Sequence, residues 1–338
     1  MNTEWRDSLQ ASGARFSDDG NTVDFGDVSA EIAAARDGTV LVPLSHLGLI
    51  RVGNEEAKSF LHNQLTSDIN HLGAEGLQHS AWCTAKGRML ASFLAWRQGD
   101  DYLLQLSSDL VAAVAKRLQM YVLRAKVTIA DLSAQTALIG LSGPQAQAAL
   151  ESAGLPRPAD AMQTLPFSGG SVLQLGETRF EIAVEASAAP ALWQKLAASA
   201  RPAGTAAWQW LDIQAAWPLI TAATKEEFVP QMANFERIGG VSFHKGCYPG
   251  QEIVARTQYL GKVKRHLYRV TCAETMAAGD ELFSAAAPDQ SCGRIVIATP
   301  NVTGGFTALA VIMEAAADAG VSLRDRAGPA LQATPVAA

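Results

Sequence analysis

The sequence predicts an α+β protein in which two similar α+β units are followed by a small β module. Three observations predict this class: apolar residues recur at helical spacing in some segments, alternate at strand spacing in others, and short turns separate the two kinds. At 338 residues, with 48% hydrophobic and 18% charged residues, the chain has the composition of a folded protein and exceeds the size of one simple core. We therefore expect two or three domains.

The first residues, 1–38, are polar and rich in Gly and Asp, and we expect a loosely packed leader there. They lack the apolar core of a signal peptide. Every apolar stretch of the chain is broken well before the roughly 18 residues that a membrane span needs. These features favour a cytoplasmic protein without a membrane partner.

The first α+β unit is expected at residues 39–133, completed by residues 206–262. Asn54 is a typical helix cap, and two glutamates follow it in the first turn. The helix that it begins carries one apolar stripe at helical spacing, formed by Ala57, Phe60, Leu61 and Leu65.

Strands and a second helix follow in the same unit. The Lys-Gly-Arg turn at residues 86–88 predicts a β-hairpin between residues 82–83 and 89–96, and residues 102–106 alternate as a half-buried strand does. A strand at residues 127–129 follows a helix whose apolar side holds Leu110, Val114, Leu118 and Tyr121. Helices are therefore expected to cover one face of an antiparallel sheet.

The second α+β unit is expected at residues 134–205. Residues 151–170, with three prolines and three glycines, predict a loop. The other predicted elements are strands at 137–141, 171–175 and 179–184 and an Ala-rich helix at about 190–200.

The C-terminal β module is expected at residues 263–314, where short β-like runs are separated by Gly, Pro and Asp. This pattern predicts a small barrel or sandwich. The Ala-rich tail at residues 315–338 is expected to be frayed.

The cysteines give no metal or disulfide pattern. Cys83, Cys247, Cys272 and Cys292 form neither a CxxC pair nor a Cys/His pair at zinc-like spacing. We therefore expect no metal site, and at least three reduced thiols without a function.

Cys247 differs from the other three because of its neighbours. Gly246, Pro249 and Gly250 shape its segment into a loop, and Lys245 brings a cation beside the thiol, which favours a thiolate. A turn with an incidental cysteine is the alternative, because sequence distance assigns no catalytic base.

A basic stretch follows this loop in a chain whose net charge is −6. Residues 256–269 contain no acidic residue and hold five cations: Arg256, Lys262, Lys264, Arg265 and Arg269. This segment either binds a phosphate, a polyanionic tail or RNA, or is a solvated strand pair with its charges facing water. The acidic total argues against direct nucleic-acid binding.

Several motifs together resemble the signature of the YgfZ family. They are FVPQ at 228–231, GGVSF at 239–243, KGCYPGQE at 245–252 and VAR at 254–256, with HNQLTSD at 62–68 and CTAKGRM at 83–89. The likeness covers most of the chain from about residue 40 to residue 312.

The resemblance implies the fold of the glycine cleavage T-protein, with three domains in a ring around a channel that holds tetrahydrofolate or a one-carbon folate. It implies that Cys247 is the functional thiol, supported by the other motif residues Gly246, Tyr248, Gly250, Gln251 and Glu252. It also implies that a set of cations receives the glutamate tail of folate, namely Lys86, Arg88, Lys245 and Arg256.

Two positions depart from the related patterns. T-proteins carry a carboxylate on the strand after the Gly turn, and residues 88–94 contain none, so aminomethyl transfer lacks its general base. On the helix before the motif, Gln214 stands where the family often has a Glu that meets the pterin. An amide still hydrogen-bonds the pterin edge, without the charge-assisted pair.

The function implied is a folate-binding accessory protein that supports assembly, repair or maintenance of iron–sulfur clusters, and thereby tRNA methylthiolation. Its expected partners are folate and iron–sulfur enzymes such as a tRNA methylthiotransferase. A folate-dependent aminomethyl or one-carbon transferase and an RNA-binding module are the alternatives, so the sequence leaves open whether the protein is an enzyme.

Overall fold

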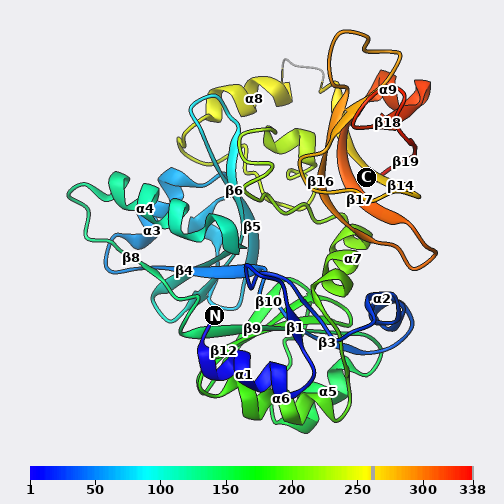
Figure 1. Ribbon diagram of the computed structural model, residues 1–338. Helices are drawn as coiled ribbons and strands as arrows, with labels where there is room; N and C mark the ends of the chain where they lie inside the picture. Colours follow the sequence, from blue (N-terminus) through cyan, green and yellow to red (C-terminus); the bar gives the residue numbers. More distant parts are fainter. Residues whose placement is uncertain (260–262, 337–338) are drawn as a thin grey trace. The chain divides into compact units, whose positions relative to one another are not determined.

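The computed structural model describes residues 1–259 and 263–336 (Figure 1). Its contacts divide the chain into two compact units. Unit 1 comprises residues 1–60, 70–78 and 93–208, and unit 2 comprises residues 61–69, 79–92 and 209–338. Within the described ranges, no helix is both long enough and apolar enough to cross a membrane.

Unit 1 contains a six-stranded sheet in the order β10-β11-β12-β9-β3-β13. Neighbouring strands are antiparallel except β13 and β3, which are parallel. The strands are β3 (Val40–Pro43), β9 (Thr136–Ser142), β10 (Gln163–Phe167), β11 (Gly170–Gly176), β12 (Arg179–Glu185) and β13 (Arg201–Pro202). Residues 163–167 were expected to be loop and instead form the edge strand β10, which its pairing with β11 stabilises.

Helices cover one face of this sheet: α1 (Thr3–Ala11), α5 (Ala146–Ala153) and α6 (Ala189–Ala197). Because side chains alternate along a strand, Phe180, Ile182 and Val184 of β12 enter the core under these helices. Arg179 and Glu181 of the same strand are buried on the opposite face.

A second sheet has five strands in the order β5-β6-β7-β4-β8. They are β4 (Leu47–Gly53), β5 (Leu77–Cys83), β6 (Met89–Gln98), β7 (Asp101–Ser107) and β8 (Thr128–Asp131). The predicted hairpin and its following strand are therefore present. The helix after β7, α4 (Val111–Val122), follows the short helix η2 (Ser108–Leu110) and buries Val114 and Leu118 as predicted, while Tyr121 is exposed.

Unit 2 contains a closed barrel in the order β14-β17-β16-β15-β18-β19, with orange to red strands in Figure 1. Its strands are β14 (Arg265–Cys272), β15 (Glu281–Phe283), β16 (Gly293–Pro300), β17 (Phe306–Met313), β18 (Val321–Leu323) and β19 (Ala330–Pro335). The prediction of an α+β fold with a C-terminal β-barrel is confirmed.

The expectation of a frayed C-terminal tail was wrong. Residues 314–335 form the helix α9 (Glu314–Ala319) and two barrel strands, and Val321, Leu323 and Leu331 are buried in the barrel core. Strand β18 pairs with β15 and with β19, and β19 also pairs with β14, so the segment is held by strand pairing on both sides.

The expectation of a loosely packed N-terminal leader was also wrong. Residues 1–38 form α1, the short pair β1 (Arg15–Phe16) and β2 (Val23–Asp24), and α2 (Val28–Asp37). Trp5 and Leu9 of α1 are buried, and the Trp5 ring meets that of Trp193 edge-on at 5.6 Å. Two large apolar side chains thus anchor a segment whose composition is otherwise polar.

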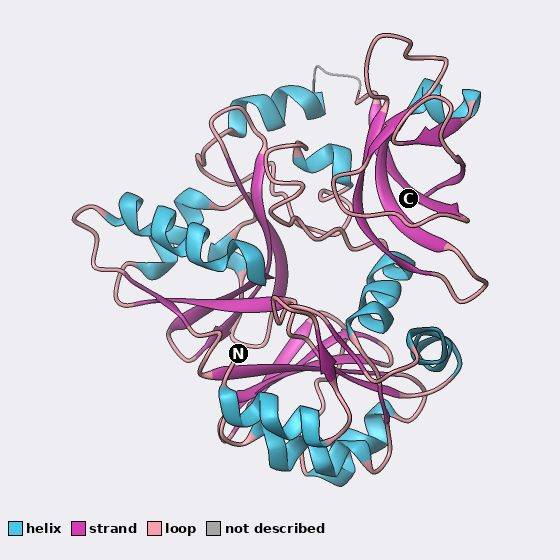
Figure 2. Cartoon of the chain, viewed as in Figure 1, coloured by secondary structure: helices cyan, strands magenta, loops and turns pink. Residues whose placement is uncertain are grey.

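The remaining helices carry or flank the motif residues named in the sequence analysis (Figure 2). They are α3 (Ala57–Gln64), η1 (Ile69–His71), α7 (Thr205–Ala215), η3 (Pro230–Ala233) and α8 (Gln251–Tyr259). A loop between η3 and α8 holds Cys247.

Candidate functional site

Cys247 is the exposed cysteine of the chain, whereas Cys83, Cys272 and Cys292 are buried. Burial raises the pKa of the Cys83 thiol to about 12, so this group stays protonated and inert at neutral pH. Among the four cysteines, all of which the structure describes, Cys247 is therefore the one that solvent can reach.

Lys245 fixes this loop from the inside. Its side chain is buried, and its ammonium donates hydrogen bonds to the carbonyl oxygens of Leu65 at 2.5 Å, Ser67 at 3.0 Å and His62. These carbonyls lie at and just beyond the C-terminal end of α3, where a helix leaves its last acceptors unpaired and partly negative. Lys245 therefore caps α3 and ties the Cys247 loop to it.

Burial also affects the titration of this lysine. Loss of water around the ammonium lowers the pKa of Lys245 to about 8, and the Asp68 carboxylate partly opposes that shift. Lys245 is thus charged at neutral pH but close to its titration range.

Two further hydrogen bonds hold the start of the loop to the segment after α3. The Thr66 hydroxyl donates to the carbonyl of Gly240 at 2.6 Å, and the Ser242 amide donates to the Thr66 carbonyl at 2.9 Å. The loop is therefore attached to one segment both before and at the KGC motif.

His62 lies beside the loop residue that precedes the thiol. Its Nδ1 is 3.2 Å from a carboxylate oxygen of Asp68, and a Cβ placed on Gly246 would lie 3.4 Å from its Nε2. A Cβ at position 246 would therefore be in ordinary van der Waals contact with the imidazole, so His62 packs beside this glycine.

Tyr248, on the other side of the thiol, points inward. Its ring is buried, and the Lys245 ammonium lies 5.1 Å from the ring centroid. Burial raises the pKa of Tyr248, and the proximity of Cys83 adds to that shift. Lys245 and Tyr248 thus form the buried base of the loop, and Cys247 between them is exposed.

The end of the loop is packed tightly against the turn at residues 86–88. Gly250 has a φ of +83°, and a Cβ there would lie 2.4 Å from the Thr84 carbonyl oxygen and 2.7 Å from the Gly87 Cα. Gly87, with a φ of +71°, would in turn bring a Cβ within 3.1 Å of Ile253. Only glycines allow this approach, which joins the Cys247 loop to the cationic turn.

The last motif residues, Gln251 and Glu252, begin α8. The helix is held in place by Gln231, whose side-chain amide donates to the Val254 carbonyl at 2.7 Å. Gln251 is half-buried and Glu252 is exposed.

A pocket of about 520 Å³ lies beside this helix in unit 2. Its apolar lining comes from Val229, Met232, Ile253 and Val263, and its polar lining from Thr257 and the five cations Lys86, Arg88, Arg256, Lys264 and Arg265. We call it the cationic pocket. No aspartate or glutamate belongs to its lining.

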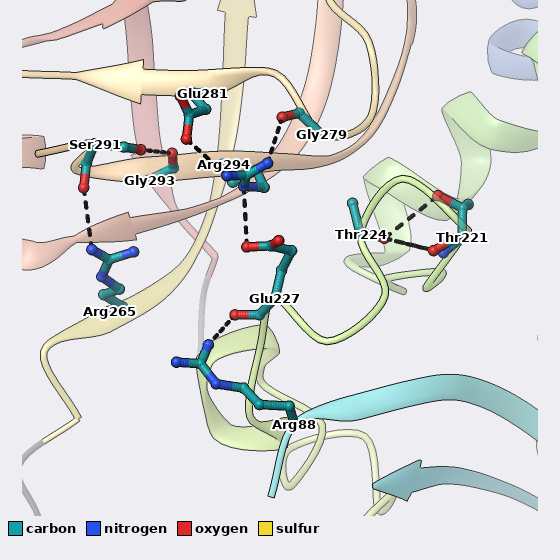
Figure 3. Close-up of polar contacts among 10 residues, drawn as sticks. All are labelled: Arg88, Thr221, Thr224, Glu227, Arg265, Gly279, Glu281, Ser291, Gly293 and Arg294. Carbon is teal, nitrogen blue, oxygen red and sulfur yellow. Dashed lines mark hydrogen bonds and ion pairs between the residues drawn. The ribbon is translucent and has the colours of Figure 1, made fainter. Parts of the chain in front are cut away.

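Two of these arginines are held by backbone carbonyls (Figure 3). Arg88 donates to the carbonyl of Glu227, and Arg265 donates to that of Ser291 at 3.2 Å. The Glu227 carboxylate lies 3.3 Å from Arg294 of β16, and Arg294 also pairs with Glu281 of β15 at 2.8 Å. The turn that carries Arg88 is thus connected to the barrel.

The structure brings some of the predicted folate residues together and separates others. Lys86, Arg88 and Arg256 line the cationic pocket, whereas the ammonium of Lys245 is already bound to three carbonyls and does not. Gln214 is exposed near the end of α7, and its carbonyl accepts a hydrogen bond from Arg269 at 2.9 Å.

Sequence reasoning did not assign Lys264 and Arg265 to the folate set, although both belong to the predicted basic stretch. Lys264 and Arg265 line the cationic pocket because of where β14 begins relative to α8. The spacing of residues along the sequence does not reveal that position. Lys262, the third cation of that part of the stretch, lies outside the described residues.

Metal-binding side chains do not gather in the part of the chain that the structure describes. No group of three or more His, Cys, Asp or Glu side chains there could hold a metal ion. The candidate site therefore consists of the exposed Cys247 thiol and the cationic pocket.

Comparison with known proteins shows the family and the fold of the chain. Residues 6–241 match the family described as the GCVT N-terminal domain. The chain is 34% identical to the tRNA-modifying protein YgfZ of Colwellia psychrerythraea over 240 residues, which is 68% of this chain and 71% of that protein. It is 34% identical to the tRNA-modifying protein YgfZ of Cronobacter sakazakii, over 70% of this chain and 72% of that protein.

Among solved structures, the chain is similar to the glycine cleavage system aminomethyltransferase T from Bartonella henselae. The TM-score is 0.82 at 21% identity, and the match covers 99% of this chain and 97% of that one. The T-protein-like fold predicted from the sequence is thereby confirmed. The chain belongs to the family of the GCVT N-terminal domain, and within it to the YgfZ proteins.

Proposed function

We propose that this protein is a folate-binding accessory factor that supports the assembly, repair or maintenance of iron–sulfur clusters, and thereby tRNA modification. The observation that carries the proposal is the exposed thiol of Cys247 on a loop anchored by Lys245. Its relatives are named tRNA-modifying proteins, which supports an effect on tRNA modification. The clients that we propose are iron–sulfur enzymes such as a tRNA methylthiotransferase.

The anchored loop suits a thiol that must meet a partner protein. Lys245 and Tyr248 on either side of Cys247 are buried, so the thiol is held outward while its neighbours are fixed. Such an arrangement lowers the conformational entropy lost when the loop binds a client. All four cysteines are unpaired thiols, which suits the reducing cytoplasm that we propose as its location.

The residues present also fit a folate. A folate has a flat ring system with hydrogen-bonding edges and a carboxylate tail, and it supplies a carrier for one-carbon units. We propose that the Gln214 amide meets the pterin edge and that Lys86, Arg88 and Arg256 receive the tail. The apolar lining of the cationic pocket beside these cations is the feature that supports the fit.

An accessory role is preferred to aminomethyl transfer for a chemical reason. Residues 89–94, the first part of β6, read Met-Leu-Ala-Ser-Phe-Leu and offer no carboxylate to act as general base. The Ser92 hydroxyl has a structural role, because it accepts a hydrogen bond from the Ile220 amide at 2.9 Å.

The thiol part of the proposal is tested in cells that lack the chromosomal copy and express either the natural chain or Cys247→Ser. We expect Cys247→Ser to lose most of the methylthiolated tRNA and the activity of a second iron–sulfur enzyme, at equal protein level. Cys272→Ser, which removes a buried thiol, is the matched control. Full modification in the Cys247→Ser cells would refute a role for the thiol.

The folate part is tested by calorimetry with tetrahydrofolate on the natural chain and on Gln214→Glu. We expect micromolar binding that tightens in Gln214→Glu, because a carboxylate forms a charge-assisted hydrogen bond with the pterin N–H groups. Absence of binding by both proteins would reject folate as the ligand and leave the Cys247 loop as the functional feature.

A further inference from the structure

Three of the five exposed large apolar side chains in the described ranges lie together at the end of helix α4. Met120 is 68% exposed, Tyr121 44% and Leu123 87%. Leu118 and Val122 provide the buried side of the same helix, so the exposed group is not part of the core. Because burial of apolar area is what stabilises a fold, an apolar group gathered in water at one point requires an explanation.

Leu123 also has an unfavourable backbone conformation. Its φ is +48° and its ψ is −106°, and the Ala125 amide donates a hydrogen bond to the Val122 carbonyl at 2.8 Å. These angles are close to the roughly +60° and −120° of the first central residue of a type II′ turn, a position that favours glycine. A leucine there costs free energy through steric strain, which a glycine would avoid.

Packing within the chain does not offset this strain. A strained residue in a core is held by the contacts of its side chain, but the Leu123 side chain lies almost wholly in water. The sequence therefore places an apolar side chain where glycine would fit the turn better and where the fold gains little from it. A residue that is both strained and exposed in this way indicates contact with another molecule.

The charge near Leu123 is positive. Residues 110–130 contain no Asp or Glu and hold four cations: Lys116, Arg117, Arg124 and Lys126. Lys126 pairs with Glu55 at 2.7 Å. Lys116 and Arg124 are exposed, and neither forms an ion pair with any residue that the structure describes. The charges of Lys116 and Arg124 are therefore available to another molecule.

These two cations flank the apolar group in the sequence. Lys116 is one turn before Met120 on the exposed side of α4, and Arg124 directly follows Leu123. We propose that this group is a docking surface for a partner protein that offers an apolar pocket bordered by carboxylates. We call it the α4 surface, and it consists of Lys116, Met120, Tyr121, Leu123 and Arg124. The pocket of the partner receives Leu123, and its carboxylates face the two cations.

Two other occupants fit the α4 surface less well. An anionic membrane would attract its cations, but the chain as a whole carries a net charge of −6 and would be repelled. A second copy of the chain that met this surface through a twofold axis would bring like charges together. A protein partner needs only a local group of carboxylates and meets neither difficulty.

The partner that we assign to the α4 surface is an iron–sulfur client, and to this extent the inference rests on the proposed function. The Cys247 thiol lies on a short loop, which provides little area for a stable contact with a client protein. The α4 surface provides an apolar anchor and complementary charge for that contact.

The experiment measures the binding of the full chain to a purified tRNA methylthiotransferase by biolayer interferometry, for the natural chain and for Leu123→Gly. We expect Leu123→Gly to bind about tenfold more weakly or worse, because a leucine side chain buried at an interface contributes at least that factor. Its unfolding temperature should be unchanged or up to about 3 °C higher, because glycine relieves the strain of the turn. A clear loss of stability, or binding at the natural affinity, would overturn the inference.

Charge-matched double variants test the contribution of the two cations. Lys116→Gln/Arg124→Gln is expected to bind the enzyme about tenfold more weakly at low salt, and the difference should shrink as salt is raised, because exposed charge pairs are screened. Lys195→Gln/Arg201→Gln removes the same charge from exposed positions of α6 and β13 and is expected to bind as the natural chain does. Equal weakening in both double variants would show that net charge alone determines binding, which contradicts a defined docking surface.

Parallel measurements in cells separate this inference from the proposed function. Leu123→Gly should lower the level of methylthiolated tRNA several-fold at equal protein level. Loss of this modification in Cys247→Ser but not in Leu123→Gly overturns the inference and leaves the proposed function intact. Full modification in Cys247→Ser instead refutes the proposed role of the thiol, whereas binding of the enzyme that depends on Leu123 would still support the α4 surface.

Two further outcomes would overturn the inference. The first is that the natural chain does not bind the methylthiotransferase. The second is that vesicles containing phosphatidylglycerol bind the natural chain but not Leu123→Gly, which would make the α4 surface a membrane contact.

Discussion

The ammonium of Lys245 and the carbonyl oxygen of Leu65 are joined by a buried hydrogen bond of 2.5 Å, which links a lysine of the KGC motif to the end of helix α3. A lysine next to a reactive cysteine invites the interpretation that its charge activates the thiol. Here the ammonium instead points away from solvent and holds the loop that carries the thiol.

Replacing Lys245 by Met should weaken the protein and alter its response to pH. At pH 7 we expect a loss of about 1–3 kcal/mol in the free energy of unfolding, because buried carbonyls lose their donor. The pKa of Lys245 is about 8 in the folded protein, below the usual 10.5, so the unfolded chain binds more protons between these values. The natural chain should therefore gain stability as the pH rises from 8 to 10.5, and the variant should lack that gain.

Urea unfolding at several pH values measures both effects. The exposed Lys58→Met is the control for the loss of one ammonium. Parallel pH profiles for the natural chain and Lys245→Met would contradict the buried, proton-losing state assigned to this lysine.

Replacing Gly250 by Ala should be strongly destabilising. The added methyl group would lie 2.4 Å from the Thr84 carbonyl oxygen, at a φ of +83° that alanine adopts poorly. The clash and the backbone strain together predict a loss of about 2–4 kcal/mol in unfolding free energy, measured by chemical denaturation.

Gly239→Ala separates these two causes. Gly239 has a φ of +74° but no atom within 4 Å of the added group, so it should lose only about 1 kcal/mol. If Gly250→Ala were as stable as Gly239→Ala, the close packing of Gly250 on the Gly87 turn would be disproved.

His46 should make unit 1 sensitive to acid. Its ring is buried, and neither ring nitrogen has a hydrogen-bond partner within the described residues. Burial, assisted by the nearby Arg179 charge, lowers the pKa of His46 to about 4. The unfolded chain takes up a proton below pH 6.5 while the folded chain does not, so stability is lost as pH falls from 6.5 to 4, by about 3 kcal/mol.

His46→Leu should remove that loss, which thermal unfolding between pH 7 and pH 4 can follow. The exposed His244→Leu serves as the comparison, because it deletes an imidazole without changing a buried position. An acid sensitivity that persists unchanged in His46→Leu would show that another group is responsible.

Thiol labelling should distinguish Cys247 from the other cysteines. In the folded protein a disulfide reagent such as DTNB is expected to react quickly with one thiol, and with all four after denaturation. The fast phase should be absent from Cys247→Ser. Rapid labelling of a second thiol would mean that Cys83, Cys272 or Cys292 is more accessible than its burial indicates.

Much of the fold follows from local patterns in the sequence. The hairpin around the Gly87 turn, the helix containing Val114 and Leu118, and the β-rich C-terminal module all follow from periodicity and turn residues. Periodicity does not predict burial where a few apolar residues pack against a core formed by segments that are distant in the sequence. This is why the burial of Trp5 in the N-terminal region and of Leu323 in the last barrel strands could not be predicted.

The residue types of the site could be predicted from the sequence, but the contacts that each residue makes could not. The motif located Cys247, and the resemblance grouped Lys86, Arg88 and Arg256, which the structure places around one pocket. It also grouped Lys245 with them, yet burial against the α3 carbonyls gives that lysine a different task. Adjacency in sequence cannot distinguish a lysine that faces solvent from one that turns inward.

The closure of the barrel has a consequence for how the protein is made. Strand β14, which begins at the pocket residue Arg265, pairs on one side with β19, at residues 330–335 near the C-terminal end of the sequence. As the chain leaves the ribosome, β14 emerges long before β19 does, and one edge of it stays unpaired in the meantime. The nascent chain thus passes through an interval in which this edge is open to aggregation or to chaperones, and that interval lasts until β19 has emerged and paired.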